Sequence, residues 1–521
     1  MGARGTWTNR DASTTLCGRV SNAALRPCGG LEATRSGVLG IPMLLAWASG
    51  TANGLNTNNV YKISTRLRDM GERVLAPGAE EAFLVSSLFI GGMIGVFAGA
   101  WVARRHGRVK ALMFGECVVI MFGILQGMFL NVLMITIFRC FLGIGLGVCT
   151  LTKPMFVAEI TPERSRGGVL AMFTLGWAFG MGVINLMDSL LGKDFEGAWR
   201  VLAIVPIWPA VTLLTAALAG KVPESPIWAH EQTEAEKSSQ RSDRKAKCHE
   251  KEEEETAHLL LSLNKNKKSD DIDESRHLRA ARGTLSDSSI LKRGVFIGCV
   301  YGAACVGCTV ALIISYQEDR VRCQGEMEKE NDSSAWWTAS LLAAQFCGAV
   351  AAVYLVPVLS RRAVIVRGGG AAVVTGLAAF AYSGAVGSSD ELGRALVLLY
   401  AFLSVSCVLA PYFVLVGGEL FHPRIRTQGV SLTLAFWYML VVFADSFLCV
   451  KLNEKDDEGG GGSANELCSM RIGGLAVALV CIFALGLTLP ETKGVPLKLM
   501  PTVWNTESLF WRSAADRSPM V

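Results

Sequence analysis

The stretch 154-PMFVAEITPERSRG-167 closes a long apolar run, and a related stretch, 419-ELFHPRIR-426, closes another one far along the chain. In both stretches a Glu precedes an Arg by seven residues. The two pairs are Glu159 with Arg166 and Glu419 with Arg426. A charged motif that returns at the end of two apolar runs indicates a chain built from two related halves.

The composition places both halves in a membrane. Of the 521 residues, 51% are hydrophobic and 18% are charged, against about 25% charged in soluble domains, which argues against a soluble enzyme. A membrane helix needs about 20 mostly apolar residues, and the sequence supplies twelve such runs. The predicted spans are 37–60, 82–103, 111–130, 132–157, 168–191, 199–220, 294–316, 335–358, 364–385, 394–418, 428–450 and 471–489. A net charge of +5 is small for this length, so no nucleic-acid partner is expected.

A charged gap separates the sixth run from the seventh. It contains KSSQRSDRKAK and EKEEEE, and it has too little apolar surface to form a core. We therefore expect an all-α polytopic membrane protein with two pseudo-symmetric six-helix bundles, two tails and one long loop. The regions are the tail 1–36, the bundle 37–220, the loop 221–291, the bundle 292–490 and the tail 491–521.

Basic residues predict the orientation. The even-numbered short connections (104–110, 158–167, 359–367 and 419–427) carry 11 Lys and Arg against 3 acidic residues, whereas the odd-numbered ones carry 10 against 19. Because Lys and Arg concentrate in cytoplasmic loops, we expect both termini and the long loop in the cytoplasm. The plasma membrane is the expected location, with an organelle membrane as the alternative.

Each half also ends on a second repeated signature, Val222-Pro-Glu224-Ser-Pro226 after span six and Leu489-Pro-Glu491-Thr-Lys-Gly494 after span twelve. An isolated surface ion pair contributes only about 0 to 1 kcal/mol. Charges that recur at equivalent places in both halves instead indicate a cytoplasmic gate, whose pairs form on closing and break on opening. The predicted gate residues are Arg108, Glu159, Arg166, Glu224, Arg361, Glu419, Arg426 and Glu491.

These motifs resemble those of the sugar porters in the major facilitator superfamily, over about 37–500. The matching residues are Arg139 with Gly143, Gly145 and Gly147, then 154–167, 223–226 and 490–494. The resemblance implies two bundles related by a pseudo-twofold axis, with a small polar organic solute, a sugar or a sugar-like molecule, bound near the middle of the bilayer and moved by alternating access. It implies no cofactor, no metal and no covalent chemistry, and protons as a further partner in the coupled members.

Several positions depart from the sugar-porter pattern. Phe173 and Thr174 stand where a span-five Gln is usual, Ala303 and Ala304 replace a Gln-Gln pair, and Thr309 replaces an Asn. These residues offer fewer hydrogen-bonding groups to sugar hydroxyls, so we expect D-glucose to bind weakly at best. Arg104 replaces an acidic or Asn position and weakens one gate contact.

Polar residues within the spans are candidate solute ligands, since such residues usually face the bundle interior. The predicted set is Asn53, Asn56, Arg139, Thr174, Thr309, Gln345, Trp437, Tyr438 and Asp445. Lys153 is expected to extend to the membrane interface, and Asp188 to be interfacial. The first span has no carboxylate, unlike the first span of proton-coupled sugar porters, which favours facilitated diffusion over proton symport.

Two alternatives stay open. One is an organic-ion transporter of the same fold, supported by Asp188, Asp445 and a Gly429 placed ten residues after Glu419. The other is a solute sensor built on the porter scaffold. The retained gate motifs argue against the sensor. The sequence does not define the oligomeric state.

Overall fold

The computed structural model describes residues 35–69, 79–129, 131–191, 197–233, 237, 287–323, 331–386, 391–457 and 463–495. The chain divides into two compact units, Met1–Gly40 and Ile41–Val521, and the described helices lie almost entirely in the second. Most of the predicted tails and of the loop 221–291 lies outside the described residues. The part of that loop that is described includes a helix over 226–233.

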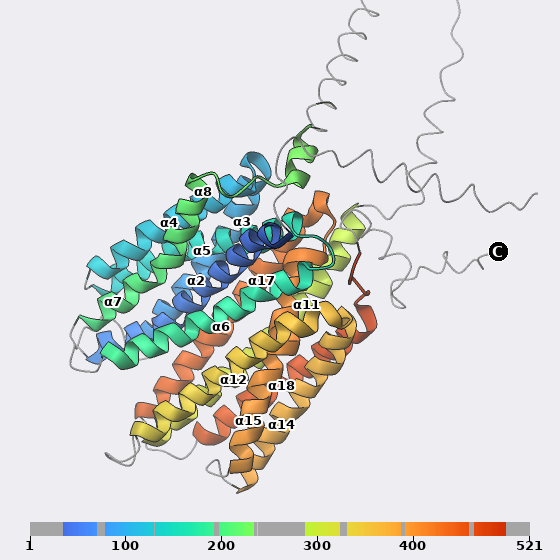
Figure 1. Cartoon of the computed structure of the whole chain (residues 1–521). Helices are drawn as coiled ribbons and strands as arrows, with labels where there is room; N and C mark the ends of the chain where they lie inside the picture. The colour runs from blue at the N-terminus through green and yellow to red at the C-terminus, as the bar shows by residue number, and fades with distance from the viewer. Residues whose placement is uncertain are drawn as a thin grey trace, which may run out of the picture. The chain divides into compact units, whose positions relative to one another are not determined.

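The first half of the chain forms one set of helices, drawn blue to green in Figure 1. Its long helices are continuous, except that the last predicted span is divided at Pro206 into two helices and a short 3-10 turn, because proline cannot donate a backbone hydrogen bond. These elements are α2 (Arg35–Asp69), α3 (Ala79–His106), α4 (Arg108–Met128), α5 (Val132–Ile160), α6 (Arg166–Leu191), α7 (Ala198–Ile204), η1 (Val205–Ile207) and α8 (Trp208–Leu218).

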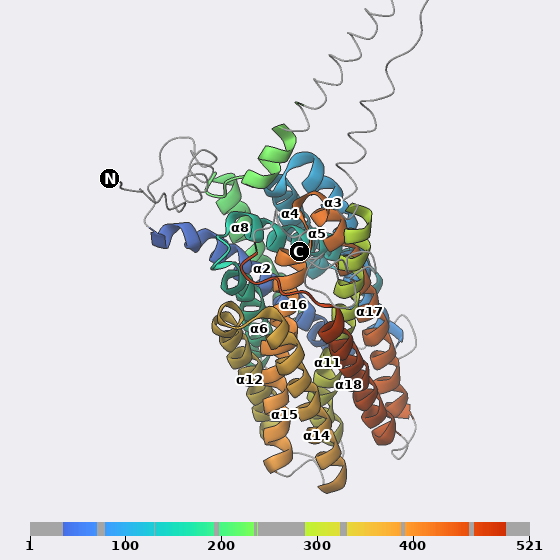
Figure 2. The same ribbon diagram turned by 90° about the vertical axis from the view of Figure 1, so that its right-hand side faces the viewer.

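The second half forms the helices drawn yellow-green to red, and three of its segments are π-helical. The elements are α11 (Asp287–Cys323), α12 (Asn331–Val358), α13 (Arg361–Ala363), η3 (Val364–Gly368), α14 (Gly369–Val386), α15 (Glu391–Ser404), η4 (Val405–Leu409), α16 (Ala410–Val414), η5 (Leu415–Glu419), α17 (Pro423–Asp457) and α18 (Ser463–Thr488). Figure 2 shows α11 beside α18 and α12 beside α15.

Among the described residues, eleven helices are long and apolar enough to cross a membrane. They coincide with eleven of the twelve predicted spans. The remaining one, 37–60, is helical within α2 but is not among the eleven, and its second half contains four asparagines.

Glycines allow the helices of the first half to approach closely. A Cβ added at Gly91 would clash with the carbonyl of Cys140, and one added at Gly143 would clash with the carbonyl of Leu88. Small residues at such crossings are typical of membrane helix pairs. Between the halves, α3 packs along α17 and α6 packs along α12, and the second of these pairs lies side by side in Figure 1.

Candidate functional site

The charged motifs of the first half meet where α3 and α5 end and α4 begins, here called the charged end. The Arg108 guanidinium binds Glu159 in a bidentate manner, with Nε donating to Oε2 at 3.1 Å and Nη2 to Oε1 at 2.9 Å. The hydroxyl of Ser225 also donates to Glu159. Glu224 accepts from the backbone N–H of Arg108 at 2.8 Å, so its carboxylate caps the start of α4.

The second half repeats this arrangement almost atom for atom. Arg361 Nε donates to Glu419 Oε2 at 3.0 Å and Nη2 donates to Oε1 at 2.8 Å. Thr492 Oγ1 donates to Glu419 Oε2 at 2.8 Å, and Glu491 accepts from the backbone N–H of Arg361 at 2.9 Å. The structure thus groups six of the eight predicted gate residues into two equivalent clusters.

The other two predicted gate residues lie between the clusters. Arg426 Nη1 is 3.7 Å from Glu159 Oε1 across the two halves. Arg166 lies in the electrostatic field of Glu419 and Arg361, and its Nε donates to the Ala158 carbonyl at 3.2 Å. The four gate arginines are each at most 5% exposed. The charged end is therefore closed by contact between the halves.

The helix of residues 226–233 packs onto the charged end. Trp228 Nε1 donates to the Arg104 carbonyl at 3.1 Å, and Gln232 Nε2 donates to the same oxygen. Burial raises the pKa of the Glu231 carboxyl, although the nearby Arg108, Arg426 and Arg424 act to lower it. The beginning of the loop that we predicted to be solvated is thus an ordered cover for the cluster.

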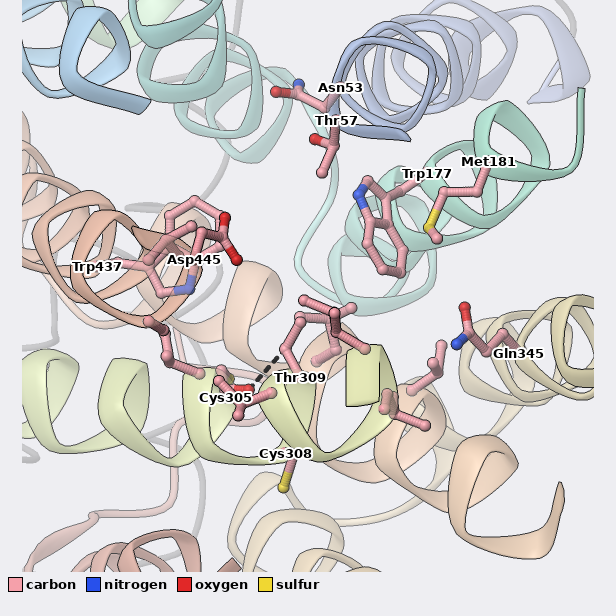
Figure 3. Close-up of a pocket in the computed structure, with 18 of the residues that line it drawn as sticks. Asn53, Thr57, Trp177, Met181, Cys305, Cys308, Thr309, Gln345, Trp437 and Asp445 are labelled. Atoms are coloured by element: carbon pink, nitrogen blue, oxygen red, sulfur yellow. Dashed lines mark hydrogen bonds between the residues drawn. The ribbon is translucent and has the colours of Figure 1, made fainter. Parts of the chain in front are cut away.

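A cavity of about 220 Å³ lies between the halves. Much of its wall is aromatic: Phe173 and Trp177 face it from α6, and Phe413 and Trp437 from α16 and α17. The ring centroids of Phe173 and Phe413 are 4.5 Å apart. Figure 3 shows Trp177 and Trp437 on opposite sides of this space. A cavity with mostly apolar walls and a few polar groups is typical of small-molecule sites.

One polar group on the wall from the second half has an unused hydrogen-bonding atom. Gln345 on α12 is 2% exposed, and its Oε1 has no hydrogen-bond partner within the described part of the chain. Its amide points toward the cavity in Figure 3. Thr309 Oγ1 instead donates to the Cys305 carbonyl at 2.8 Å, and Asp445, 4% exposed, also lines the cavity.

Three other polar groups that line the cavity bond to one another. Tyr438 Oη donates to Thr150 Oγ1 at 3.3 Å, and Thr150 Oγ1 donates to Asn53 Oδ1 at 3.1 Å. The Asn53 amide nitrogen donates to the Ser49 carbonyl at 2.9 Å. Because Tyr438 belongs to α17 and the other two side chains to α5 and α2, this chain of hydrogen bonds joins the two halves.

Three of the residues predicted to bind solute do not line the cavity. The Asn56 amide donates to the Ala52 carbonyl at 2.8 Å, and Thr174 is fully buried beside the lining residue Phe173. Arg139 is also fully buried, and its Nη2 donates to Asn59 Oδ1 at 3.2 Å and its Nη1 to Gln126 Oε1 at 3.5 Å. The other six, Asn53, Thr309, Gln345, Trp437, Tyr438 and Asp445, line it.

One wall of the cavity was not predicted from the sequence. Phe173, Trp177, Met181 and Asn185 all line it from α6. Their four-residue spacing places them on one helical face, which is a signal the sequence contains. That face was not distinguished because it reads as an ordinary apolar stripe.

The cavity extends toward the end opposite the charged end. Lining residues there include Lys62, Asn185 and Thr338, which lie close to the ends of α2, α6 and α12 that are remote from the charged end. Lys62 Nζ pairs with Asp188 Oδ2 at 2.8 Å, and the two side chains are 16% and 18% exposed. Within the described ranges no group of three or more His, Cys, Asp or Glu side chains could hold a metal.

Comparisons with known proteins agree on one family. The family model described as "Sugar (and other) transporter" matches residues 43–504. A galactose-proton symporter of Escherichia coli K12 is 31% identical over 148 residues, which are 28% of this chain and 31% of that protein. Sugar transport protein 11 of Arabidopsis thaliana is 24% identical over 450 residues, which are 82% of this chain and 79% of that protein. The chain therefore matches only about a third of the length of the bacterial relative.

A solved structure establishes the fold. The major facilitator superfamily proton:xylose symporter XylE, bound to 6-bromo-6-deoxy-D-glucose, superposes with a TM-score of 0.69 over 91% of this chain and 100% of its own, at 18% identity. The predicted fold class is confirmed.

Proposed function

The chain belongs to the sugar transporter family of the major facilitator superfamily and is a multi-pass, non-enzymatic membrane transporter, and we propose that it carries a small, partly hydroxylated organic solute through the cavity between its halves. The observation that carries this proposal is the Gln345 carbonyl, buried and unpartnered at an aromatic wall. A buried acceptor without a partner costs about 1 to 3 kcal/mol. A solute hydroxyl would remove that cost.

Hydrogen-bond accounting also supports weak binding of D-glucose. Ala303 and Ala304 supply no side-chain hydrogen bonds, and the Thr309 hydroxyl donates its hydrogen to its own helix. Elsewhere on the cavity wall, Asn53 and Thr150 bond to each other. A solute with fewer hydroxyls than a hexose and one apolar face complements this cavity better.

We propose transport by facilitated diffusion. Arg139 is surrounded by amide and carbonyl oxygens of Asn56, Asn59 and Gln126, and these groups do not titrate in the physiological range. The described part of the first predicted span contributes no carboxylate to this arginine. Proton symport, named for the bacterial galactose and xylose relatives, is the alternative outcome of the test.

The charged end is proposed as the cytoplasmic gate, with both termini in the cytoplasm and the protein in the plasma membrane. Support comes from the excess of Lys and Arg in the connections at that end and from the eight gate residues gathered there. Labelling of a cysteine placed at Lys237 by an impermeant reagent in intact cells would contradict this orientation.

Purified protein in proteoliposomes tests the function. Uptake would be measured for hexoses, pentoses, deoxy sugars, polyols and organic cations, with and without a proton gradient. We expect saturable uptake of a deoxy sugar, pentose or polyol, unchanged by an uncoupler and reduced by Gln345→Leu. Saturable glucose uptake with a sub-millimolar half-saturation constant would refute the substrate proposal, and uptake that follows the proton gradient would refute facilitated diffusion.

One observation favours a second candidate, an organic cation. Asp445 places a carboxylate in the wall of a cavity whose aromatic rings can also attract a cation. Asp188, the other residue that suggested this class, is paired with Lys62. Saturable uptake of organic cations, abolished by Asp445→Asn, would replace the sugar-like solute by this one.

A further inference from the structure

The basic residues that reach the membrane surface beside the charged end lie on α3 and α4. Lys153, whose sequence position suggested the interface, is not one of them, because its Nζ is 2.7 Å from Glu116 Oε1 and both side chains are 1% exposed. Arg104 and Arg105 in the last turn of α3 and Lys110 in the first turn of α4 are exposed instead. A single residue separates these two membrane-crossing helices, so the three bases gather at one end of both.

An apolar stripe on α3 leads up to these bases. Ile94, Phe97 and Trp101 are exposed, and their spacing of three and four residues places them on one helical face, which Arg104 and Arg105 continue. Exposed apolar side chains within a span contact lipid chains, and tryptophan is enriched where a span meets the headgroups. The Cζ atom of Arg105 lies over the Trp101 ring, 5.7 Å from its centroid, within the range of a cation–π contact. The stripe therefore ends in a guanidinium that is oriented at headgroup level.

The turn between the two helices does not require these bases. Arg108 Nη1 donates to the Ala103 carbonyl at 3.0 Å, and Arg361 Nη1 donates to the Val356 carbonyl in the second half, so the two turns correspond residue by residue. The second half carries no charge at the positions that correspond to the three bases, which are Pro357, Val358 and Ala363. Within the described part of the chain, none of the three basic side chains has a hydrogen bond or an ion pair. They are therefore available to a partner from outside the fold.

We propose that Arg104, Arg105 and Lys110 bind the headgroup of an anionic phospholipid, whose acyl chains lie along the α3 stripe, and that the bound lipid stabilises the cover over the charged end. The planar guanidinium matches the oxygens of a phosphate, and each base near an anionic membrane surface strengthens binding about fivefold. The Arg104 backbone carbonyl accepts from both Trp228 and Gln232 of the covering helix. A lipid held by the side chains of this turn keeps that carbonyl in place.

Native mass spectrometry of the purified chain tests the binding. The protein in detergent is titrated with dioleoyl phosphatidylglycerol, and dioleoyl phosphatidylcholine, which has the same chains and no net charge, is the comparison. We expect phosphatidylglycerol to bind more tightly, and its binding constant to fall at least about tenfold in R105Q/K110Q. R164Q/R424Q removes the same charge from two exposed positions at the same end, and it should bind this lipid as the unmodified protein does.

A third variant distinguishes a defined site from diffuse attraction. Trp101→Leu keeps every charge but removes the ring beneath Arg105, so it should weaken phosphatidylglycerol binding by about threefold. Amide hydrogen exchange in nanodiscs tests the effect on the cover. Exchange at 226–233 should be at least about twofold slower when phosphatidylglycerol is present than in phosphatidylcholine alone, and the difference should disappear in R105Q/K110Q.

Equal binding of the two lipids, or equal losses in R105Q/K110Q and R164Q/R424Q, would overturn the site. Unchanged binding in Trp101→Leu would do so as well, because only the surface charge would then matter. Exchange at 226–233 that does not respond to the lipid would refute the effect on the cover. Because no solute is present, every one of these results leaves the proposed transport function to its own test.

Discussion

The two halves share a charged end but differ one layer deeper. Arg108 with Glu159 and Arg361 with Glu419 have the same bidentate geometry. The first half also holds a second ion pair between two continuous α-helices, whereas the second half has π-helical turns at Val364–Gly368 and Leu415–Glu419. The repeated charges thus define the closed end, while the interiors have diverged.

The difference indicates where the backbone can adjust. A π-helical turn holds an additional residue and is frequent at functional sites. One such segment, Val405–Leu409, contributes Val405, Val408 and Leu409 to the cavity wall, whereas α5 contributes its lining residues from a regular helix. The wall from the second half therefore combines irregular backbone with the unpartnered Gln345 carbonyl.

The largest expected effect comes from removing one arginine of either charged cluster. Arg108→Ala leaves Glu159 buried without its bidentate partner, and Arg361→Ala does the same to Glu419. Removing one partner of a buried pair costs about 3 to 5 kcal/mol. Thermal unfolding in detergent should show losses of similar size, because the two clusters are equivalent. Arg362→Ala, at an exposed site, is the control. A loss confined to one half would show that only one cluster supports the fold.

Charge reversal between the clusters should have the next largest effect. Arg166→Glu places a carboxylate near Glu419, and Arg426→Glu places one near Glu159. Like charges forced together cost several kcal/mol, so the closed end should open and uptake should fall by about tenfold or more, with surface expression still measurable. Wild-type uptake in Arg166→Glu would contradict the gate. Arg424→Glu, at an exposed position two residues before Arg426, tests for a general charge effect.

The sequence predicted the fold but only part of the site. The apolar runs and the repeated Glu and Arg residues determine the helices and the charged end, because both signals are periodic along the chain. The partner of Lys153 could not be read in this way, since Glu116 meets it only through the packing of α4 on α5. Arg139 and Asn56 were expected in the cavity because polar residues in spans face the bundle interior. The interior also contains buried polar side chains away from the cavity, and Arg139 donates to two of these, Asn59 and Gln126.

A smaller effect, on solute affinity, should distinguish the cavity wall that bears Gln345 from the wall that bears Asn53. Gln345→Leu removes the unpartnered carbonyl and should raise the solute dissociation constant by about tenfold, which corresponds to about 1.4 kcal/mol. Asn53→Leu removes an amide that already bonds to Thr150 and Ser49, so solute affinity should change little while the rate of transport falls. Binding of the transported solute by calorimetry, with uptake rates, would separate the two. Equal losses of affinity would show that both walls contact the solute.

The smallest effect is expected at the end of the cavity opposite the charged end, where Lys62 pairs with Asp188. This pair is within one half and is several times more exposed than the pairs of the charged end, so water and salt screen it. Partly exposed pairs contribute about 0 to 1 kcal/mol. Asp188→Asn should therefore change the half-saturation constant by less than about fivefold, and the change should shrink further at high salt. A loss of uptake as large as that of Arg166→Glu would mean that the end opposite the charged end has a gate of its own. The ion pairs at the two ends would then be of similar strength, although the side chains of the charged end are much more deeply buried than Lys62 and Asp188.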